Sequence, residues 1–341
     1  MRRRDSGRTR DAPGGTLRVG DEATPRLAVG DEALIEVVRW AREALARSDA
    51  FELEVPDPDA GVGPSSGVPP RSWRAWVDLA EVLACRCHTP ERVAAGTVRV
   101  RFTPLAPEAS WHGGIGDAER YDPASSFGAV RKLEHPGFLV PLLEALGRVR
   151  PPDGGRVLVL GCHRGDEIEA LGALDPPPRS LAITGVDRSG RALAVARARF
   201  PLASFVEGDV NDLPPALGRF HLVVAIGLLQ SPGVDDKALL RRLVQHHLEA
   251  GAGLLLGLPN SRFRGNEVTW GARTRNYRAS DLSLVVRDLA TYRRYLQQHG
   301  FVTHVGGRYD LLLTAWRRAC DSAEAKVGRL RRRRTPDATQ E

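Results

Sequence analysis

Two aspartates and one glycine-containing loop are the residues of this sequence whose types and spacing best suit the binding of a nucleoside. The loop runs from Gly161 to Gly165 and follows the apolar run VLVL. Asp187 follows the run ITGV, and Asp209 follows the run SFVEG. Small residues let a backbone approach a ligand closely, and a carboxylate at the end of a strand can accept both hydroxyls of a ribose.

Four apolar runs between residues 156 and 226 must position these groups, and we predict them as strands that alternate with three helices. Each run ends in Gly, Asp or a small polar loop and is followed by helix-forming residues. This pattern is typical of βαβ units, which build a parallel sheet whose ligand site lies at the carboxyl ends of its strands.

The C-terminal part of the sequence extends this sheet. We predict a fifth strand over residues 251–259 and a long helix over 281–299. Two further strands, over 301–305 and 308–318, are joined at Gly306-Gly307. Two strands around a Gly-Gly pair are typical of an antiparallel hairpin.

With these elements in order, residues 156–316 resemble the class I S-adenosylmethionine (SAM)-dependent methyltransferases. The matches are the Gly161–Gly165 loop, Asp187, Asp209 and the run FHLVVAIGLLQSPG (220–233), with the late hairpin as independent support. The resemblance implies an α/β fold with a doubly wound, mostly parallel seven-strand sheet and a terminal antiparallel hairpin strand. It also implies SAM as cofactor and methyl transfer (EC 2.1.1.-) as the activity.

The resemblance implies a role for each part of the site. The loop would hold the methionine portion of SAM, Asp187 the ribose hydroxyls and Asp209 the adenine amino group, with Val210 against the adenine ring. The cofactor-binding residues expected on this basis are Gly161, Cys162, His163, Gly165, Asp187, Arg188, Asp209, Val210, Ile226 and Gly227.

The loop departs from the acidic-x-Gly-x-Gly-x-Gly pattern of the family at two positions. Val159 stands at the acidic position and His163 at the middle glycine. The contact to the SAM ammonium group is therefore open, with Asp166 or Glu167 as possible replacements. A dinucleotide-binding oxidoreductase is the alternative for this core, but its G-x-G-x-x-G pattern is absent because His163 and Asp166 interrupt it.

The methyl acceptor is not readable from these motifs. Segments 111–127 and 259–280 are rich in aromatic and polar residues, and they are expected as a flap and an acceptor-binding loop. A general base is needed only if the acceptor must lose a proton, and His112, Glu267 and His163 are weak candidates. The absence of Asn/Asp-Pro-Pro-Tyr after the fourth strand weakens an exocyclic-amine acceptor, and the absence of Pro-Cys there argues against a cysteine adduct on a pyrimidine carbon. The acceptor is left unidentified, with a small molecule favoured over protein or RNA.

Four parts of the chain are distinguished by composition. We predict a disordered basic tail, a small N-terminal α+β domain, a methyltransferase domain and a second basic tail over residues 1–30, 31–110, 111–318 and 319–341. The formal net charge of +7 arises at the ends, because residues 1–10 and 317–341 carry +4 each. The basic ends leave open an RNA methyltransferase that uses the tails. Val159 and His163 in the loop leave open a non-catalytic SAM-binding or partner-binding module.

The cysteines predict neither a disulfide framework nor a metal site. There are four in 341 residues, and Cys85-Arg86-Cys87-His88 lacks a second pair of ligands at zinc-binding spacing. We expect Cys85 and Cys87 on a helix over residues 72–87. The sequence has no run of 18 apolar residues and no apolar leader near its start, so a cytoplasmic protein without membrane attachment is predicted.

Overall fold

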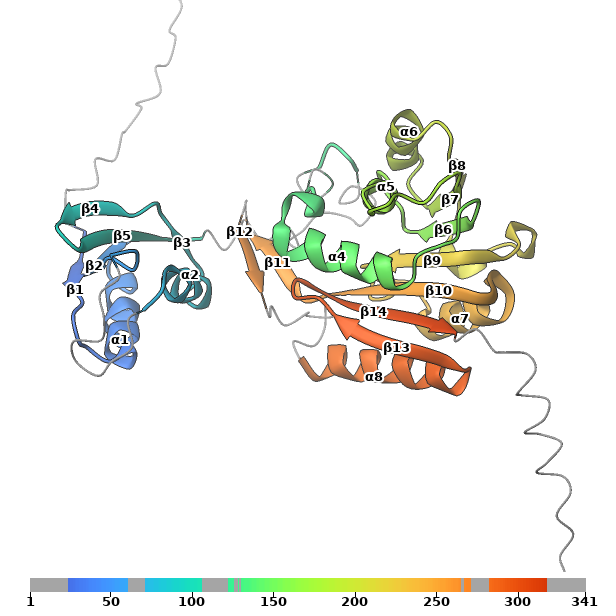
Figure 1. Cartoon of the computed structure of the whole chain (residues 1–341). Coiled ribbons are helices and arrows are strands. Elements are labelled where there is room, and N and C mark those ends of the chain that lie inside the picture. The colour runs from blue at the N-terminus through green and yellow to red at the C-terminus, as the bar shows by residue number, and fades with distance from the viewer. Residues whose placement is uncertain are drawn as a thin grey trace, which may run out of the picture. The chain divides into compact units, whose positions relative to one another are not determined.

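A computed structural model describes residues 24–60, 71–105, 122–125, 128, 130–264, 267–270 and 282–317. The chain divides into two compact units, residues 1–105 and 106–341. In Figure 1 the first is coloured blue to teal and the second green to red. No helix in the described ranges is both long and apolar enough to cross a membrane.

The first unit is a mixed sheet with two helices on one face. Its elements are β1 (Arg26–Ala28), α1 (Leu34–Leu45), β2 (Phe51–Pro56), α2 (Trp73–Val82), β3 (Cys85–Cys87), β4 (Glu91–Ala94) and β5 (Thr97–Pro104). The strand order is β1-β2-β5-β3, with β4 also paired to β5. Alternate residues of β2 and β5 point to the helices, and the rings of Phe51 and Phe102 stack there with centroids 4.7 Å apart.

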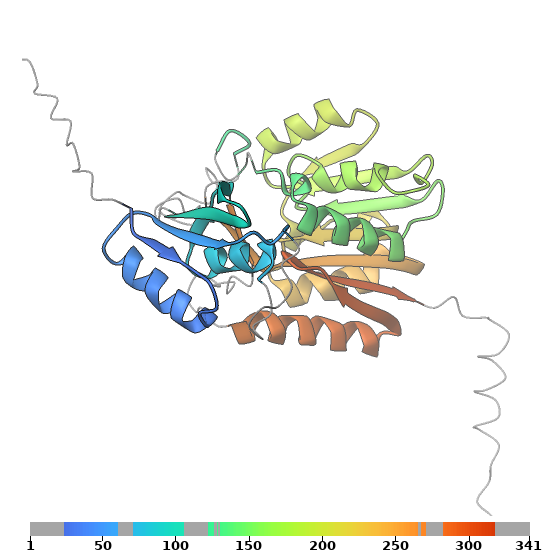
Figure 2. The ribbon, with the colours of Figure 1, turned by 60° about the vertical axis from the view of Figure 1, so that its left-hand side comes forward.

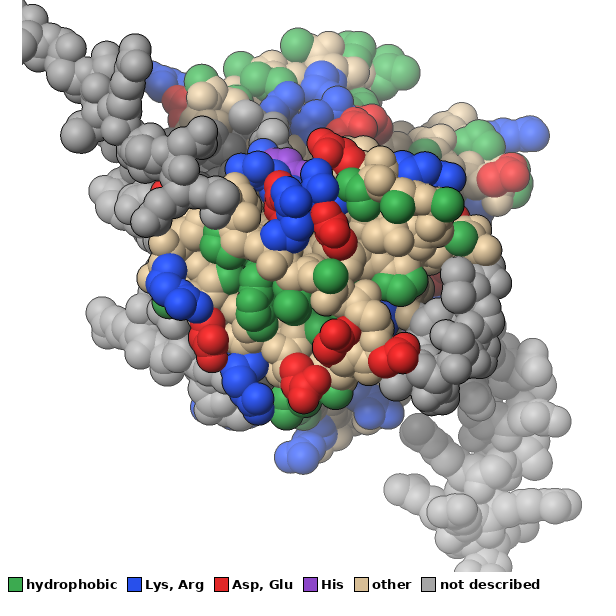
Figure 3. All heavy atoms as spheres, turned by 90° about the vertical axis from the view of Figure 1, so that its left-hand side faces the viewer, with side chains coloured by type: hydrophobic (Ala, Val, Ile, Leu, Met, Phe, Trp, Pro, Cys, Tyr) green, Lys and Arg blue, Asp and Glu red, His purple; other side chains and the backbone are tan. Residues whose placement is uncertain are grey.

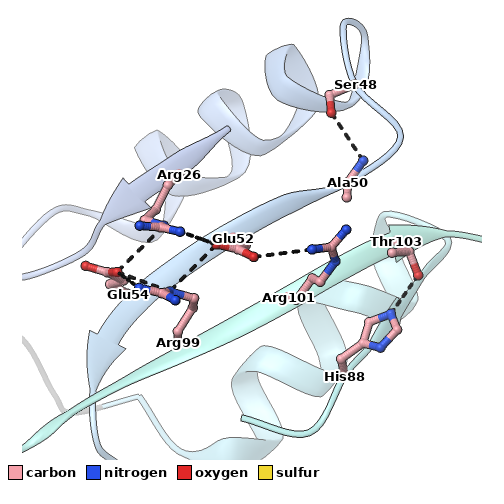
Figure 4. A network of polar contacts seen from close by, with 9 residues as sticks. All are labelled: Arg26, Ser48, Ala50, Glu52, Glu54, His88, Arg99, Arg101 and Thr103. Atoms are coloured by element: carbon pink, nitrogen blue, oxygen red, sulfur yellow. Dashed lines mark hydrogen bonds and ion pairs between the residues drawn. The ribbon is translucent and has the colours of Figure 1, made fainter. Parts of the chain in front are cut away.

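The other face of this sheet carries a network of ion pairs (Figure 4). Glu52 accepts hydrogen bonds from Arg26 at 2.8 Å and from Arg101 at 3.5 Å, and Arg99 donates to Glu54 at 2.8 Å. The space-filling view in Figure 3 shows basic and acidic side chains interspersed on the face drawn there. The alternation of apolar and charged residues in FELEVP and TVRVRF therefore separates a packed face from a solvated one.

The predicted helix over residues 72–87 is too long, and the placement of Cys85 and Cys87 on it is wrong. Helix α2 ends at Val82, and Ala84 adopts φ +53°, which breaks the helical path. Strand β3 follows and pairs with β5, so that Cys85 is buried and Cys87 is half-buried.

The second unit contains the predicted seven-strand sheet (Figures 1 and 2). Its strands are β6 (Arg156–Leu160), β7 (Ala182–Asp187), β8 (Ser204–Glu207), β9 (Phe220–Ile226), β10 (Leu248–Pro259), β13 (Phe301–Gly306) and β14 (Asp310–Arg317). The order is β13-β14-β10-β9-β6-β7-β8. Strand β14 is antiparallel to both neighbours, and the pairs from β10 to β8 are parallel. The predicted fold class, including the late hairpin, is confirmed.

Helices cover both faces of this sheet. The helical elements are η2 (Lys132–Glu134), α4 (Pro136–Arg148), α5 (Asp166–Gly172), α6 (Gly190–Arg199), α7 (Asp236–Arg242), the π-helical turn η5 (Leu243–His247) and α8 (Leu282–Gln298). Leu158 and Leu160 of β6 pack with α7 and α8, while Val157 and Val159 pack with α4 and α5. Because both faces are covered, the central strands are continuous apolar runs.

One local prediction in this unit is wrong. A third helix was expected between β8 and β9, but the 3-10 turns η3 (Val210–Asp212) and η4 (Pro215–Leu217) stand there, because Asp209 caps a tight turn and two prolines follow.

Segment 259–280, for which an acceptor-binding loop is predicted, contains the antiparallel strands β11 (Ser261–Arg264) and β12 (Glu267–Trp270).

Candidate cofactor-binding site

Asp187 lies at the carboxyl end of β7, where its carboxylate holds two backbone segments together. The side chain accepts hydrogen bonds from the amide of His163 at 2.8 Å and from the amide of Ser189 at 2.8 Å. Asp187 as a whole is only 9% exposed. Each carboxylate oxygen can accept a second hydrogen bond, so the group retains acceptor capacity for a ligand. Asp187 therefore ties the loop after β6 to the end of β7.

The loop after β6 requires glycine at both of its ends. Gly161 and Gly165 have φ values of +63° and +83°, in the left-handed region that favours glycine. A Cβ at Gly165 would lie 2.7 Å from the ring of Phe200, so a side chain does not fit there. His163 also adopts a positive φ, +43°, at the position where the family pattern has its middle glycine.

The left-handed backbone of His163 predicts a specific stability difference. His163→Gly is expected to be more stable than His163→Ala by about 1 kcal/mol, because both variants lose the imidazole but only alanine keeps the Cβ penalty. Urea unfolding of the two variants measures this difference. Equal stabilities would mean that the loop relaxes out of the left-handed conformation.

The other predicted cofactor residues lie at the ends of neighbouring strands. Asp209 is exposed just beyond β8, and its side chain accepts a hydrogen bond from the amide of Asn211 at 2.8 Å. Val210 is buried in the core on the α7 and α8 side. Gly227 follows β9 with φ +67° and donates to the carbonyl of Gly257 at 2.8 Å. Cys162 is buried, Arg188 is exposed and Ile226 is half-buried.

Helix α5, which follows the loop after β6, begins with two acidic residues, Asp166 and Glu167. Asp166 pairs with Arg199 at 2.8 Å, whereas Glu167, the next residue, is half-buried. The pKa of Glu167 is raised to about 8, mainly by burial; the charges of Asp166 and Asp187 contribute to this rise and Lys132 opposes it. Burial, followed by the charge of Asp187, also raises the pKa of the Cys162 thiol.

Residues before the first strand of the sheet contact the loop after β6 and its neighbours. Asp122 pairs with Arg191 of α6 at 2.6 Å, and Arg164 donates to the carbonyl of Gly128 at 3.2 Å. A hydrogen bond from the amide of Ala124, and then the Arg191 guanidinium, lower the pKa of Asp122. Within the predicted flap, residues 122–125 are described, and Asp122 joins them to helix α6. His112 lies outside the described residues, and of Glu267 only the backbone, in β12, is described.

A buried ion pair near the same edge was not predicted. Lys132 of η2 contacts both carboxylate oxygens of Asp310, at 3.1 and 3.2 Å, where β14 begins. The Asp310 side chain is 1% exposed. Sequence reasoning had no signal for this pair, because its two residues are 178 positions apart.

Comparison with known proteins finds methyltransferases that are similar to part of this chain. Residues 157–251 match a family model described as a methyltransferase domain. The chain is 34% identical over 123 residues to the trans-aconitate 2-methyltransferase of Paracidovorax citrulli, covering 36% of this chain and 45% of that protein. It is 28% identical over 196 residues to the enzyme of the same name from Acidovorax sp. strain JS42, covering 55% and 70%. The chain thus spans about half the length of the first of these relatives.

Solved structures share less sequence with this chain. A TehB-like SAM-dependent methyltransferase from Corynebacterium glutamicum has 16% identity and a TM-score of 0.36, covering 52% of this chain and 88% of that one. Precorrin-6y C5,15-methyltransferase from Geobacter metallireducens has 16% identity and a TM-score of 0.34, with 52% and 87% covered.

Proposed function

We propose that this chain, which carries a class I SAM-dependent methyltransferase domain, transfers a methyl group from SAM to a small acceptor that bears a carboxylate. The observation that carries the proposal is the arrangement around Asp187. Its carboxylate lies at the end of β7 and accepts a hydrogen bond from the amide of His163. The group that would bind the ribose hydroxyls is thereby joined to the glycine loop. SAM is the methyl donor of this class of enzyme.

The residues at this edge of the sheet fit the parts of SAM. Asp187 would bind the ribose hydroxyls and the exposed Asp209 the adenine amino group, while the backbone from Gly161 to Gly165 would lie along the methionine portion. Bound SAM supplies a methyl group on a sulfonium for in-line displacement by the acceptor. The protein then has to hold the two reactants in line, an effect that can supply roughly 7–11 kcal/mol of the barrier.

A carboxylate acceptor is favoured by the relatives. Trans-aconitate, which appears in the relatives' names, is a tricarboxylate. A carboxylate is ionised at neutral pH and attacks without losing a proton, so this reaction needs neither His112 nor Glu267 as a base. Those two residues would act only on an acceptor that carries a proton.

A cytoplasmic location is part of the proposal. Among the described residues, Cys85, Cys87 and Cys162 form no disulfide with one another, as expected in a reducing compartment.

Incubation with methyl-labelled SAM tests the function. We expect labelled methyl esters when tri- and dicarboxylic acids are supplied. When a cell extract is supplied instead, we expect no label in its RNA or protein. S-Adenosylhomocysteine should bind in calorimetry, and NAD should not.

Three outcomes would contradict the proposal in different ways. Absence of binding to both SAM and S-adenosylhomocysteine would remove the cofactor assignment. Binding without turnover on any fraction would favour a non-catalytic module, for which the side chain at His163 is the motivating feature. Label in RNA that disappears when residues 1–12 and 322–341 are deleted would favour the RNA enzyme.

A further inference from the structure

Val159 occupies the position at which the family pattern has an acid. Its side chain is fully buried, and in the sheet it pairs with Gly185 of β7 and Val224 of β9. It packs in the apolar cluster beneath α4 and α5. An ammonium group held beside the loop after β6 must therefore find its carboxylate on another element.

Glu167 is the acid that the fold brings to this place. It lies in the first turn of α5, two residues after Gly165. Its carboxyl interacts electrostatically with Asp187 at the end of β7 and with Lys132 of η2, which pairs with Asp310 at the start of β14. In the sheet, Asp187 lies on one side of β6, and the pair of Lys132 with Asp310 lies on the other side. The carboxyl of Glu167 therefore interacts with charges from both sides of β6.

Glu167 differs from the other acids of its helix in having no counter-ion. Asp166 pairs with Arg199 at 2.8 Å, and Glu169 pairs with Arg131 at 2.8 Å. Across the part of the chain that the structure describes, no hydrogen bond or ion pair joins the Glu167 side chain to another residue. A half-buried carboxylate without a partner is unfavourable, and a cation beside it reduces that cost.

We propose that Glu167 receives the ammonium group of the methionine portion of SAM, in place of an acid at position 159. This assignment rests on the proposed function, because it requires that SAM binds at the loop after β6. It moves the carboxylate from the end of a strand to the first turn of the following helix.

The assignment couples cofactor binding to a proton. In the ligand-free protein burial raises the pKa of Glu167 to about 8, with Asp166 on its own helix and Asp187 on β7 in support and Lys132 of η2 opposed. The group is therefore mainly protonated at pH 7. A bound ammonium favours the carboxylate, so binding releases a proton below pH 8, and affinity rises with pH until about pH 8.

Calorimetry with two ligands tests the assignment. S-Adenosylhomocysteine carries the ammonium group, and 5′-methylthioadenosine lacks the whole amino-acid portion. Glu167→Gln should bind the first about 30-fold more weakly and the second unchanged, since a lost charge-assisted hydrogen bond typically has an effect of this size. In buffers of different ionisation enthalpy, the parent should release close to one proton per S-adenosylhomocysteine at pH 7 and the variant none.

A matched control is Glu144→Gln on α4, whose carboxylate is solvent-exposed and whose nearest cation is Arg148 on the same helix. It should bind both ligands as the parent does. If the parent binds both ligands but Glu167→Gln retains full affinity for S-adenosylhomocysteine, or loses both ligands equally, the ammonium assignment is wrong while the proposed function stands. If the parent binds neither ligand, the proposed function itself fails.

Discussion

Asp187→Ala is expected to lower the affinity for S-adenosylhomocysteine at least about 100-fold and the free energy of unfolding by about 2–4 kcal/mol. The affinity falls because the ribose hydroxyls lose a charged acceptor, and because the loop after β6 loses its tie to β7. The stability falls because the amides of His163 and Ser189 lose a buried partner, which costs about 1–3 kcal/mol for each unsatisfied group. Calorimetry and urea unfolding measure the two effects.

Asp209→Ala is the comparison that separates ligand binding from folding. Asp209 is exposed and holds only the turn that begins η3. Its removal should weaken S-adenosylhomocysteine about tenfold and change stability by no more than about 1 kcal/mol. Asp187→Asn adds a second check, because the single oxygen of the asparagine side chain replaces two carboxylate oxygens. It can keep the hydrogen bond from the backbone amide of His163 or that from Ser189, but not both. Parent-like binding by Asp187→Ala would show that the ribose contact is assigned to the wrong residue.

The sheet and the residues at its edge were predictable because their signals are local. In VLVL every residue is apolar, and the structure places Val157 and Val159 on one face of β6 and Leu158 and Leu160 on the other. A run that is buried on both faces identifies a central parallel strand, and the next residue is then at the carboxyl edge. Asp187 and Asp209 could be placed at this edge by counting from the ends of such runs.

The predictions failed in two situations. In one, the helical pattern of a segment was continued into a strand; in the other, the residues in contact are distant in the sequence. The turn at Ala84 could not be read from a residue type that usually extends a helix, and so Cys85 was assigned to one. Lys132 and Asp310 are 178 positions apart, and nothing in either neighbourhood indicates the other. Glu167 could be named only as one of two acids, because its choice over Asp166 depends on Arg199 33 positions away.

Lys132→Met is expected to lower the free energy of unfolding by about 3–5 kcal/mol. The substitution leaves the carboxylate of Asp310, whose side chain is 1% exposed, without its counter-ion in the interior. Removal of one partner of a buried ion pair has effects of this size because the remaining charge is uncompensated. The pair also joins η2 to the start of β14, so the segment before the sheet should loosen, which hydrogen exchange at residues 132–135 would detect.

A double-variant cycle decides whether the loss comes from the unpaired charge. Lys132→Met combined with Asp310→Leu should recover most of the stability, because a buried pair can be replaced by apolar groups of similar volume at little cost. The coupling between the two positions should then exceed about 2 kcal/mol. A loss below about 1 kcal/mol for Lys132→Met alone would contradict this account. Lys132, whose side chain is 34% exposed, would then behave as a surface partner, and water would reach Asp310 once the lysine is removed.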